Sequence, residues 1–467
     1  MEKAKESSKL KRGGVPMALT AIRPMVAGID IGSRENWVCG PARSDGKPNV
    51  RVFGTTTADL KVLVDWLAEQ GTESVAMESA SVYWIPLLEL LEACGIEAVL
   101  VNAHQLHNVP GRKTDYHDCQ WIQLLHSCGL LRASFRPGPA VVAMRAIHRQ
   151  LANLVEERTR CVQWMQKALD QMNVQVHRAV TDLTGTTGMA IVRAIVAGER
   201  DPVKLSALRH HRCHKSVEDI ARYLTGTWRE EHLFNLASAL QLFDAVEKLI
   251  ATHESRLLEA MAALQPDDRR DAPAPPHPNP LKEKAIKGHG DQPMRTALWR
   301  FAGLDLLRID GIGTGAAKIV LTEVGPDLSA FPSENHFVSW LRLCPRRPIS
   351  GGKPLRKRRN SMGANRIAGA LRMAACSLQR TKTALGAAYR RIARFKGADV
   401  AIFAIARKLA QLVYRMMRYG QDYLDLGEAA YDRQFEARRL AALKQTAKSM
   451  GFQLTKEPVQ QPQPSAG

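Results

Sequence analysis

The sequence predicts an α/β domain at the N-terminus followed by mostly helical domains, and three observations support this prediction. Between residues 25 and 128, short apolar runs alternate with helical patterns, which is typical of a layered α/β domain with a buried, mostly parallel sheet. From about residue 140 the apolar residues keep a three-four spacing that is typical of helices. Residues 265–295 are rich in Pro and charge, lack periodicity, and separate two helical regions.

The α/β domain is expected over residues 25–138, behind a basic arm of residues 1–24. Its strands are short apolar runs, and its helices carry apolar stripes. The last helix is expected to start at Thr114, a residue type that caps helix N-termini, followed by acids that the helix dipole favours. The expected elements, in chain order, are a hairpin of MVAGIDIG and NWVCGPA, a strand VRVFGTT, a helix ADLKVLVDWLAEQ, a strand SVAMES, a helix YWIPLLELLEACG, a strand EAVLVN and the helix from Thr114.

Helices are expected along the rest of the chain. Residues 139–264 contain an apolar stripe that continues through four heptads, which is typical of a long coiled-coil-like helix that packs within the chain or on another subunit. Residues 265–295 are expected to form a mobile linker, residues 296–428 a second globular domain, and residues 429–467 a helical and then disordered tail. The stripe consists of Leu236, Ala239, Phe243, Val246, Ile250, His253, Leu257, Ala260 and Leu264.

The composition indicates a polyanionic partner. The 66 Lys and Arg outnumber the 46 Asp and Glu and give a net charge of +20, which favours nucleic acid over an anionic membrane. No apolar run is long enough to cross a bilayer, and the apolar part of the basic N-terminus is short and interrupted, so neither a membrane span nor a cleaved signal peptide is expected. The eight cysteines are scattered without a CxxC pair, which fits a reducing cytoplasm.

Four acidic residues are expected to meet at one edge of the sheet. Asp30 lies within GIDIGS on the first strand, Glu78 ends the strand SVAMES, and Asp115 and Asp118 stand three positions apart in KTDYHDCQW. In a ribonuclease-H-like sheet the first and fourth strands run side by side and a later helix packs across the same edge. The four carboxylates would repel one another unless a cation bound, and Mg²⁺ prefers such oxygen ligands. Two such ions can clamp the attacking and leaving oxygens of a phosphodiester.

These motifs also fit other kinds of site. Asp115 and Asp118 alone also fit a plain helix start. GIDIGS resembles the first phosphate loop of actin-like and sugar-kinase ATPases, but the second glycine-rich turn of that fold would have to be TDLTGTTG, which lies in a helical region. Two clusters of His and Cys lack the paired spacing of a structural zinc site: HHRCH at 210–214, and His117, Cys119, His126 and Cys128.

A glycine-rich turn is expected in the C-terminal domain. LLRIDGIGTGAAKIV places Gly311 and Gly313 between two apolar segments and resembles a helix-hairpin-helix, in which backbone N–H groups at a helix N-terminus can bind a phosphate. A plain turn between packed helices is the alternative interpretation.

A basic segment with a candidate nucleophile follows. From Arg342 to Arg366 there are nine Lys or Arg and no acid, which indicates phosphate binding. Ser350 stands directly before two glycines that would let a phosphate approach its hydroxyl, and the nearby cations would stabilise an alkoxide. A solvated basic face is the alternative. The candidate nucleic-acid-binding side chains are Arg346, Arg347, Lys353, Arg356, Lys357, Arg358 and Arg359.

The ordered motifs GIDIGS, AMESASVYW, KTDYHDCQW and PRRPISGGK resemble those of the DEDD transposases of the insertion-sequence family one-hundred-and-ten, the bridge-RNA-guided recombinases. The resemblance covers residues 25–428 and implies a RuvC-like N-terminal domain, a coiled-coil segment for dimerisation and a C-terminal transposase domain. It also implies that Asp30, Glu78, Asp115 and Asp118 bind Mg²⁺, with Mn²⁺ as the other candidate, and that Ser350 forms a covalent phosphoserine with DNA.

The resemblance further implies the partners: donor and target DNA, a bridge RNA, and other copies of the chain, as a dimer and as a tetramer in the synaptic complex. A bacterial cytoplasmic, nucleoid-associated location follows from the same family. Two rival functions remain open. A Holliday-junction resolvase would use the same four acids to activate water without Ser350, and a non-catalytic nucleic-acid-binding scaffold would explain the charge but not the acids.

Overall fold

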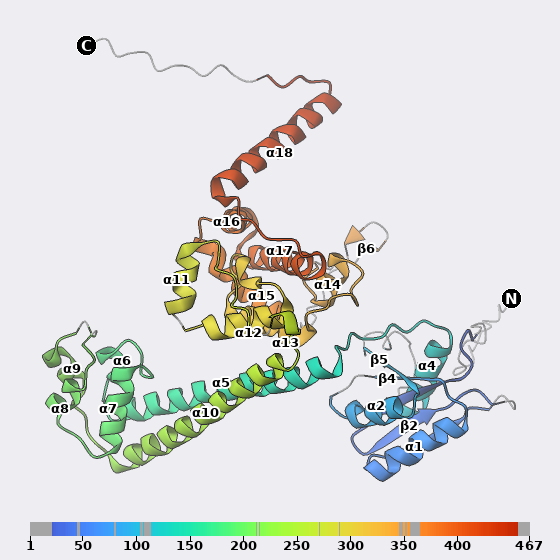
Figure 1. The fold of residues 1–467 in the computed structure, drawn as a ribbon, viewed down its shortest axis with the longest axis horizontal. Coiled ribbons are helices and arrows are strands. Elements are labelled where there is room, and N and C mark those ends of the chain that lie inside the picture. Colours follow the sequence, from blue (N-terminus) through green and yellow to red (C-terminus); the bar gives the residue numbers. More distant parts are fainter. Residues whose placement is uncertain are drawn as a thin grey trace, which may run out of the picture. The chain divides into compact units, whose positions relative to one another are not determined.

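The computed structural model forms two compact units, Met1–Arg136 and Pro137–Gly467 (Figure 1). The structure describes residues 21–43, 47–78, 81–102, 106, 114–211, 213, 215–269, 271–288, 290–344, 349–350, 353–354 and 365–455. Within these ranges, no helix combines the length and apolar character that a bilayer crossing requires.

The first unit contains a five-stranded sheet with the strand order β3-β2-β1-β4-β5. Strands β1 and β2 form the expected hairpin, β3 pairs antiparallel with β2, and β4 and β5 continue the sheet parallel to β1. Every strand expected from the sequence is present, and the parallel pairing of β1 with β4 brings their carboxyl ends to one edge. The strands are β1 Val26–Ile31, β2 Glu35–Cys39, β3 Val50–Gly54, β4 Ser74–Glu78 and β5 Glu97–Val101.

Helices cover both faces of this sheet. Helices α1 (Thr57–Glu69) and α2 (Trp84–Ala93) bury their leucines against one face, in a core that includes Ile29 and Met77. Helix α4 (Asp115–Ser127) lies on the other face, where Ile122 packs with the intervening residues of β4 and β5. Because successive strand residues point to opposite faces, Gly28 and Asp30 of β1 lie on the side of α4.

Gly28 allows α4 to approach β1 closely. A Cβ atom at this position would lie 2.5 Å from the carbonyl oxygen of Cys119 and 2.8 Å from the Cα of Gln123, both in α4. Real Cβ atoms do not approach backbone atoms so closely, so any side chain at residue 28 would push the helix away. The missing side chain therefore sets the distance between the helix that carries Asp115 and Asp118 and the strand that carries Asp30.

The second unit begins with two long helices, α5 (Pro139–Gln171) and α10 (Glu230–Ala262), that pack along each other within the chain. Arg158 of α5 forms an ion pair with Glu247 of α10 at 3.1 Å. The stripe residues Leu236, Ala239, Phe243, Val246, Ile250 and Leu257 are buried. Four short helices connect the two long ones and bury a core against their ends: α6 Val176–Ala179, α7 Thr186–Val196, α8 Pro202–Ala207 and α9 Val217–Tyr223.

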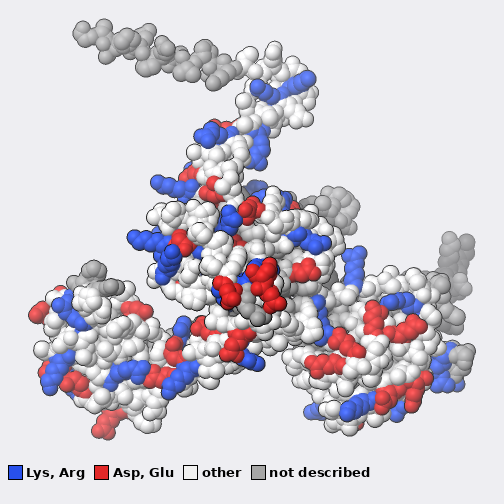
Figure 2. All heavy atoms as spheres, in the orientation of Figure 1, with Lys and Arg blue, Asp and Glu red and all other residues white. Residues whose placement is uncertain are grey.

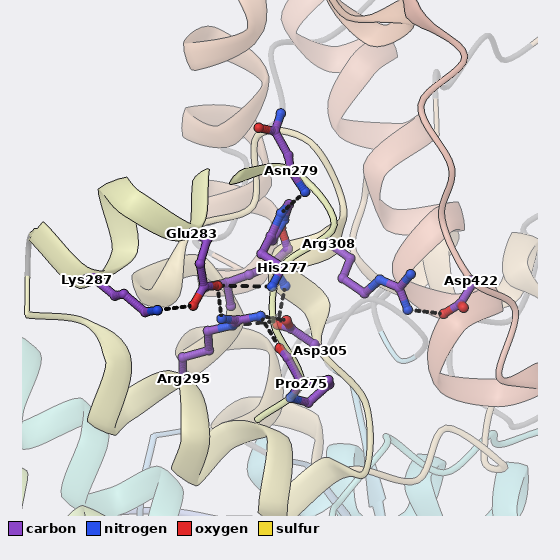
Figure 3. A network of polar contacts seen from close by, with 10 residues as sticks. Pro275, His277, Asn279, Glu283, Lys287, Arg295, Asp305, Arg308 and Asp422 are labelled. Carbon is purple, nitrogen blue, oxygen red and sulfur yellow. Dashed lines mark hydrogen bonds and ion pairs between the residues drawn. The ribbon is translucent and has the colours of Figure 1, made fainter. Parts of the chain in front are cut away.

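Residues 265–295 contain helical elements where the structure describes them, although the sequence shows no helical periodicity there. A 3-10 turn η1 (Asp267–Arg269) and helix α11 (Pro280–Gly288) lie within this segment, and α12 (Gln292–Ala302) begins in it. A buried guanidinium organises the segment instead of an apolar stripe. Arg295 donates to Glu283 at 2.7 Å, to Asp305 at 2.6 Å and to the carbonyl oxygen of Pro275 at 2.8 Å. Figure 3 shows these residues grouped around the guanidinium.

The C-terminal part of this unit is a helical bundle, as expected. Its core includes Phe337 and Leu371, and the hydroxyl of the buried Tyr414 donates to the carbonyl oxygen of Phe331 at 2.7 Å. The remaining elements are η2 Leu306–Arg308, α13 Thr314–Val324, α14 Glu334–Trp340, β6 Ile349–Ser350, β7 Lys353–Pro354, α15 Arg366–Ser377, η3 Leu378–Arg380, α16 Ala384–Lys396, α17 Ala398–Tyr419 and α18 Gly427–Ser449.

We predict that Gly28→Ala destabilises the first unit by about 1–3 kcal/mol, because the new methyl group forces α4 away from β1. Hydrogen exchange in α4 should become faster, and chemical denaturation should show the loss. Gly369→Ala serves as the opposite control: this glycine lies inside α15 with open space around it, so alanine should stabilise its unit by about 0.5–1 kcal/mol. Unchanged exchange in α4 of Gly28→Ala would contradict the proposed close packing.

We also predict that Arg295→Met destabilises the second unit by about 3–5 kcal/mol, because it leaves the carboxylate of Asp305 buried without its partner. Residues 265–295 should then become sensitive to limited proteolysis. Arg256→Met removes an exposed pair with Glu259 and should change the free energy of unfolding by less than about 1 kcal/mol. Equal losses for the two variants would show that the buried network does not hold this segment.

Candidate active site

Three of the four predicted acids meet at the edge of the sheet. Asp30 stands near the end of β1, and Asp115 and Asp118 lie in the first turn of α4. One carboxylate oxygen from each residue lies within 4.8 Å of the others. Glu78, the last residue of β4, lines the same cleft but does not belong to this close group. The structure thus brings the four residues to one cleft and places three of them in contact range of a single ion.

Local sequence explains why α4 presents both aspartates here. Thr114 is extended at the N-cap, and its side-chain oxygen accepts a hydrogen bond from the N–H of His117. Residues three apart lie on one face of a helix, so Asp115 and Asp118 point the same way. Gly28 then lets the following turns of α4, at Cys119 and Gln123, lie directly on the strand that carries Asp30.

The three aspartates fit a hard divalent cation. Mg²⁺ binds oxygen at about 2.1 Å, so two ligands on opposite sides of one ion lie about 4.2 Å apart. Three ligands of one octahedral ion include at least two adjacent pairs, about 3 Å apart, so the carboxylates, which now lie within 4.8 Å of one another, would rotate towards the ion. Aspartate oxygens are also the donor type that Mg²⁺ and Mn²⁺ prefer over imidazole or thiolate. Within the described residues, Asp30, Asp115 and Asp118 form the group of acidic, His or Cys side chains that lie close enough together to hold a metal ion.

The surrounding cleft has a volume of about 620 Å³ and combines acids with aromatic and basic side chains. Trp37 of β2 and Arg34 of the β1–β2 turn lie on one side, and Trp121 of α4 also lines it. The buried indole N–H of Trp121 finds no hydrogen-bond acceptor among the residues that the structure describes. The cleft residues are Asp30, Ile31, Gly32, Ser33, Arg34, Glu35, Trp37, Glu78, Leu106, Asp115, Asp118, Trp121 and Ile122.

The thiol of Cys119, the residue that follows Asp118 in α4, is buried and unreactive. Burial is the main cause that raises its pKa to about 12, and the neighbouring Cys39 and Asp30 raise the pKa further. The thiol therefore stays protonated at neutral pH, and its sulfur donates to the carbonyl oxygen of Tyr116 at 3.3 Å. Cys119 acts as a small core residue.

Three residues of this cleft, Trp37, Arg34 and Trp121, were not expected from the sequence. Trp37 and Asp30 are direct partners in the β1–β2 register, so their side chains share one face of the sheet. Counting back from the hairpin turn would have revealed this pairing. Trp121 stands three residues after Asp118, the same helical spacing that pairs the two aspartates, so this position could also have been read from the sequence.

The glycine turn of the second unit leads into a helix N-terminus. Gly313 is the N-cap of α13 and offers no capping side chain, and the hydroxyl of Thr314 is buried with no partner within the described residues. Gly311 has φ +86°, and a Cβ there would lie 2.9 Å from the carbonyl oxygen of Ala374, so glycine is required. The preceding segment is the 3-10 turn η2, not the α-helix that a helix-hairpin-helix would have.

A polar cluster joins α13 to α5 in the same unit. Arg149 donates to both carboxylate oxygens of the buried Glu323, at 2.9 and 2.7 Å, and Arg145 pairs with the same carboxylate. The ring of His148 lies 2.7 Å from the hydroxyl of Thr322, and burial lowers the pKa of His148 to about 4, so this imidazole is neutral. The long helix is therefore fastened to the helix that follows the glycine turn.

Ser350 lies in a two-residue strand. Strand β6 pairs antiparallel with β7, and Ser350 is the register partner of Lys353. Ser350 therefore lies in a strand and not on a helix, in agreement with the expectation that this segment does not flank a helix. The expected nucleic-acid-binding residues Arg346, Arg347, Arg356, Lys357, Arg358 and Arg359 lie outside the described residues.

Two family models match this chain. The model of DEDD transposases of the IS110 type, described as a transposase, matches residues 27–174, which include the sheet and its acids. The model described as a transposase of the IS116/IS110/IS902 family matches residues 304–390, which include the glycine turn and Ser350. No curated protein matches the sequence. The two matches occur in the order expected for one enzyme, and the chain belongs to the IS110 family of DEDD transposases, which cleave and rejoin DNA.

Proposed function

We propose that this transposase exchanges DNA strands through a covalent serine intermediate, with Mg²⁺ or Mn²⁺ bound by Asp30, Glu78, Asp115 and Asp118. The single observation that carries the proposal is the meeting of three carboxylates in the first unit, which together offer the oxygen ligands that a hard divalent cation prefers. The family that matches the chain acts on DNA, whose phosphodiesters are the groups that such a cation activates.

The serine would supply the nucleophile. Its Oγ would form a bond to the scissile phosphorus while the bond from phosphorus to the deoxyribose oxygen breaks, and the hydroxyl proton would leave with that oxygen. A later attack by a DNA hydroxyl on the phosphoserine would restore Ser350 and join the new strand. Bound at the acids, the cation would stabilise charge on the phosphate, while the carboxylates hold its position. Lys353, the register partner of Ser350, and the basic residues around it would bind the DNA backbone.

We also propose the domain type, the oligomeric state and the partners of this chain from its membership of the family. The sheet order β3-β2-β1-β4-β5 supports a RuvC-like, ribonuclease-H-like domain. The long helices α5 and α10 would carry dimer contacts in a coiled coil, and a tetramer would form the synaptic complex with donor and target DNA and a bridge RNA in the bacterial cytoplasm. We propose that Gly311 and Gly313 bind a phosphate at the N-terminus of α13.

The net charge of +20 supports a nucleic-acid partner. Figure 2 shows Lys and Arg side chains spread over both units and interspersed with Asp and Glu. The densest basic run of the sequence, from Arg342 to Arg366, contains Ser350, so the proposed nucleophile and the proposed phosphate contacts occupy one segment. A Holliday-junction resolvase would use the same acids with water as the nucleophile, and only the role of Ser350 separates the two functions.

We predict that Asp118→Asn lowers DNA cleavage by roughly a hundredfold or more, since a lost ligand misplaces the reacting phosphate. Addition of Mg²⁺ should raise the melting temperature of the wild type and raise that of the variant less. Asp65→Asn, an exposed change of the same kind on α1, is the matched control and should behave as the wild type. Wild-type cleavage by Asp118→Asn would remove this residue from the metal site.

We predict that the wild type becomes covalently attached to one DNA end on a suicide substrate that loses its leaving strand, and that Ser350→Ala does not. The adduct should also require a divalent cation and Asp30, because the hydroxyl attacks only an activated phosphate. Ser361→Ala is the matched control and should keep the adduct. DNA cleavage without an adduct in the wild type would favour the resolvase, and an adduct in Ser350→Ala would assign the nucleophile to another residue, with Ser361 and Tyr116 as the next candidates.

A further inference from the structure

Two aromatic rings stand directly beside the acid cluster. Trp37 is the register partner of Asp30 across the β1–β2 hairpin, so the two Cβ atoms lie about 5 Å apart on the same face. Tyr116 stands between Asp115 and Asp118 in the first turn of α4. The ring centroids of Trp37 and Tyr116 are 6.3 Å apart, with an interplanar angle of 89°. Strand β2 and helix α4 thus each place one aromatic ring beside the acid cluster.

One hydrogen bond and two ring contacts hold this pair in position. The indole N–H of Trp37 donates to the carboxylate of Glu35 at 2.9 Å, which restrains rotation of the ring. Tyr116 also contacts the ring of His117, at a centroid distance of 5.3 Å. An aromatic pair that served only the core would be buried, yet Tyr116 is 40% exposed and Trp37 lines the open cleft. The two rings therefore keep surface that a ligand can cover.

The neighbouring side chains indicate which class of ligand the two rings can bind. Aromatic rings next to a phosphate site bind nucleobases by stacking, and every base offers a face for it. Inside a duplex both faces of a base are covered by its neighbours, so a base can reach such a ring only after it leaves the stack. Arg34 lies in the turn between β1 and β2 and lines the same cleft, where its cation can contact an adjoining phosphate.

We propose that Trp37 and Tyr116 form an aromatic shelf that holds one unpaired base of the DNA strand whose phosphate lies at Asp30, Asp115 and Asp118. The proposal rests on the proposed function, because the acids are taken to mark the scissile phosphate. It adds a substrate requirement: the nucleotide next to the cleavage point is unstacked when the strand is cut. Trp37 and Tyr116 are then positioning residues that fix the phosphate through its own base.

Photo-crosslinking of the full-length protein tests the shelf directly. The probe is a mixed-sequence single-stranded oligodeoxynucleotide that carries 5-iodouracil, which crosslinks to aromatic side chains on which it stacks. Crosslinks are expected at Trp37 or Tyr116, and the same sequence annealed as a duplex should give several-fold fewer. Crosslinks confined to aromatic residues other than Trp37 and Tyr116 would overturn the proposal. Crosslinks at the shelf from the matching RNA, but not from DNA, would overturn the assignment to a DNA strand.

Substitutions give a second measurement. At salt concentrations that weaken phosphate contacts, Trp37→Ala and Tyr116→Leu should each weaken binding of the single strand by about tenfold, whereas Tyr116→Phe should bind as the wild type. Trp164→Ala, which removes an exposed tryptophan from α5, is the matched control. A rise in melting temperature with Mg²⁺ in each variant would show that the acid cluster is intact. Wild-type affinity and crosslinking yield in both Trp37→Ala and Tyr116→Leu would overturn the proposal.

The outcomes separate this inference from the proposed function. Suppose that the wild type cleaves DNA and forms a covalent adduct, and that the shelf variants bind the single strand normally. These results would support the transposition mechanism and overturn the aromatic shelf. Crosslinks at Trp37 or Tyr116 in a protein that forms no adduct would support the shelf and count against the serine mechanism.

Discussion

The close contact between β1 and α4 is the constraint on which the candidate site depends. Asp30 belongs to a strand whose position is fixed by its neighbours on both sides, whereas Asp115 and Asp118 belong to a helix held on one face of the sheet. Because residue 28 has no side chain, the backbone of α4 can rest on the strand itself. The buried side chains of Ile122 and Cys119 hold α4 on this face of the sheet.

Much of the first unit could be predicted because its elements carry strong local patterns. Alternating strands and helices, the cap at Thr114 and the order of the four acids were all readable, and the structure has each element in its expected place. The expected convergence holds for Asp30, Asp115 and Asp118, while Glu78 only lines the cleft. Trp37 was missed because its importance comes from cross-strand register, a relation between residues seven apart that no local pattern displays.

The segment 265–295 could not be predicted for a different physical reason. Sequence patterns detect order through apolar periodicity, and this segment has none. Its order comes from polar groups that meet only after folding: Arg295 comes from α12, and the carboxylates that it binds come from α11 and from the turn before η2. The backbone N–H of His277 is the main cause that lowers the pKa of Glu283 to about 2, which keeps this carboxylate charged beside the arginine. The proline-rich composition therefore explains why the segment lacks apolar periodicity, but it does not show which polar side chains meet in the folded chain.

The helix pair of the second unit has the geometry of a lever arm. A helix of 33 residues is about 50 Å long, and α5 is fastened to α13 near its start, by Arg145 and Arg149, while the four short helices sit at its other end. About 33 Å of helix separates the fastening point from that end, so a rotation of about 10° at Glu323 would move the small helical core by about 6 Å. A small rotation of α5 beside the glycine turn would thus become a displacement of several ångströms at α6 to α9. The pivot of this rotation would be the carboxylate of Glu323, which pairs with Arg145 and Arg149.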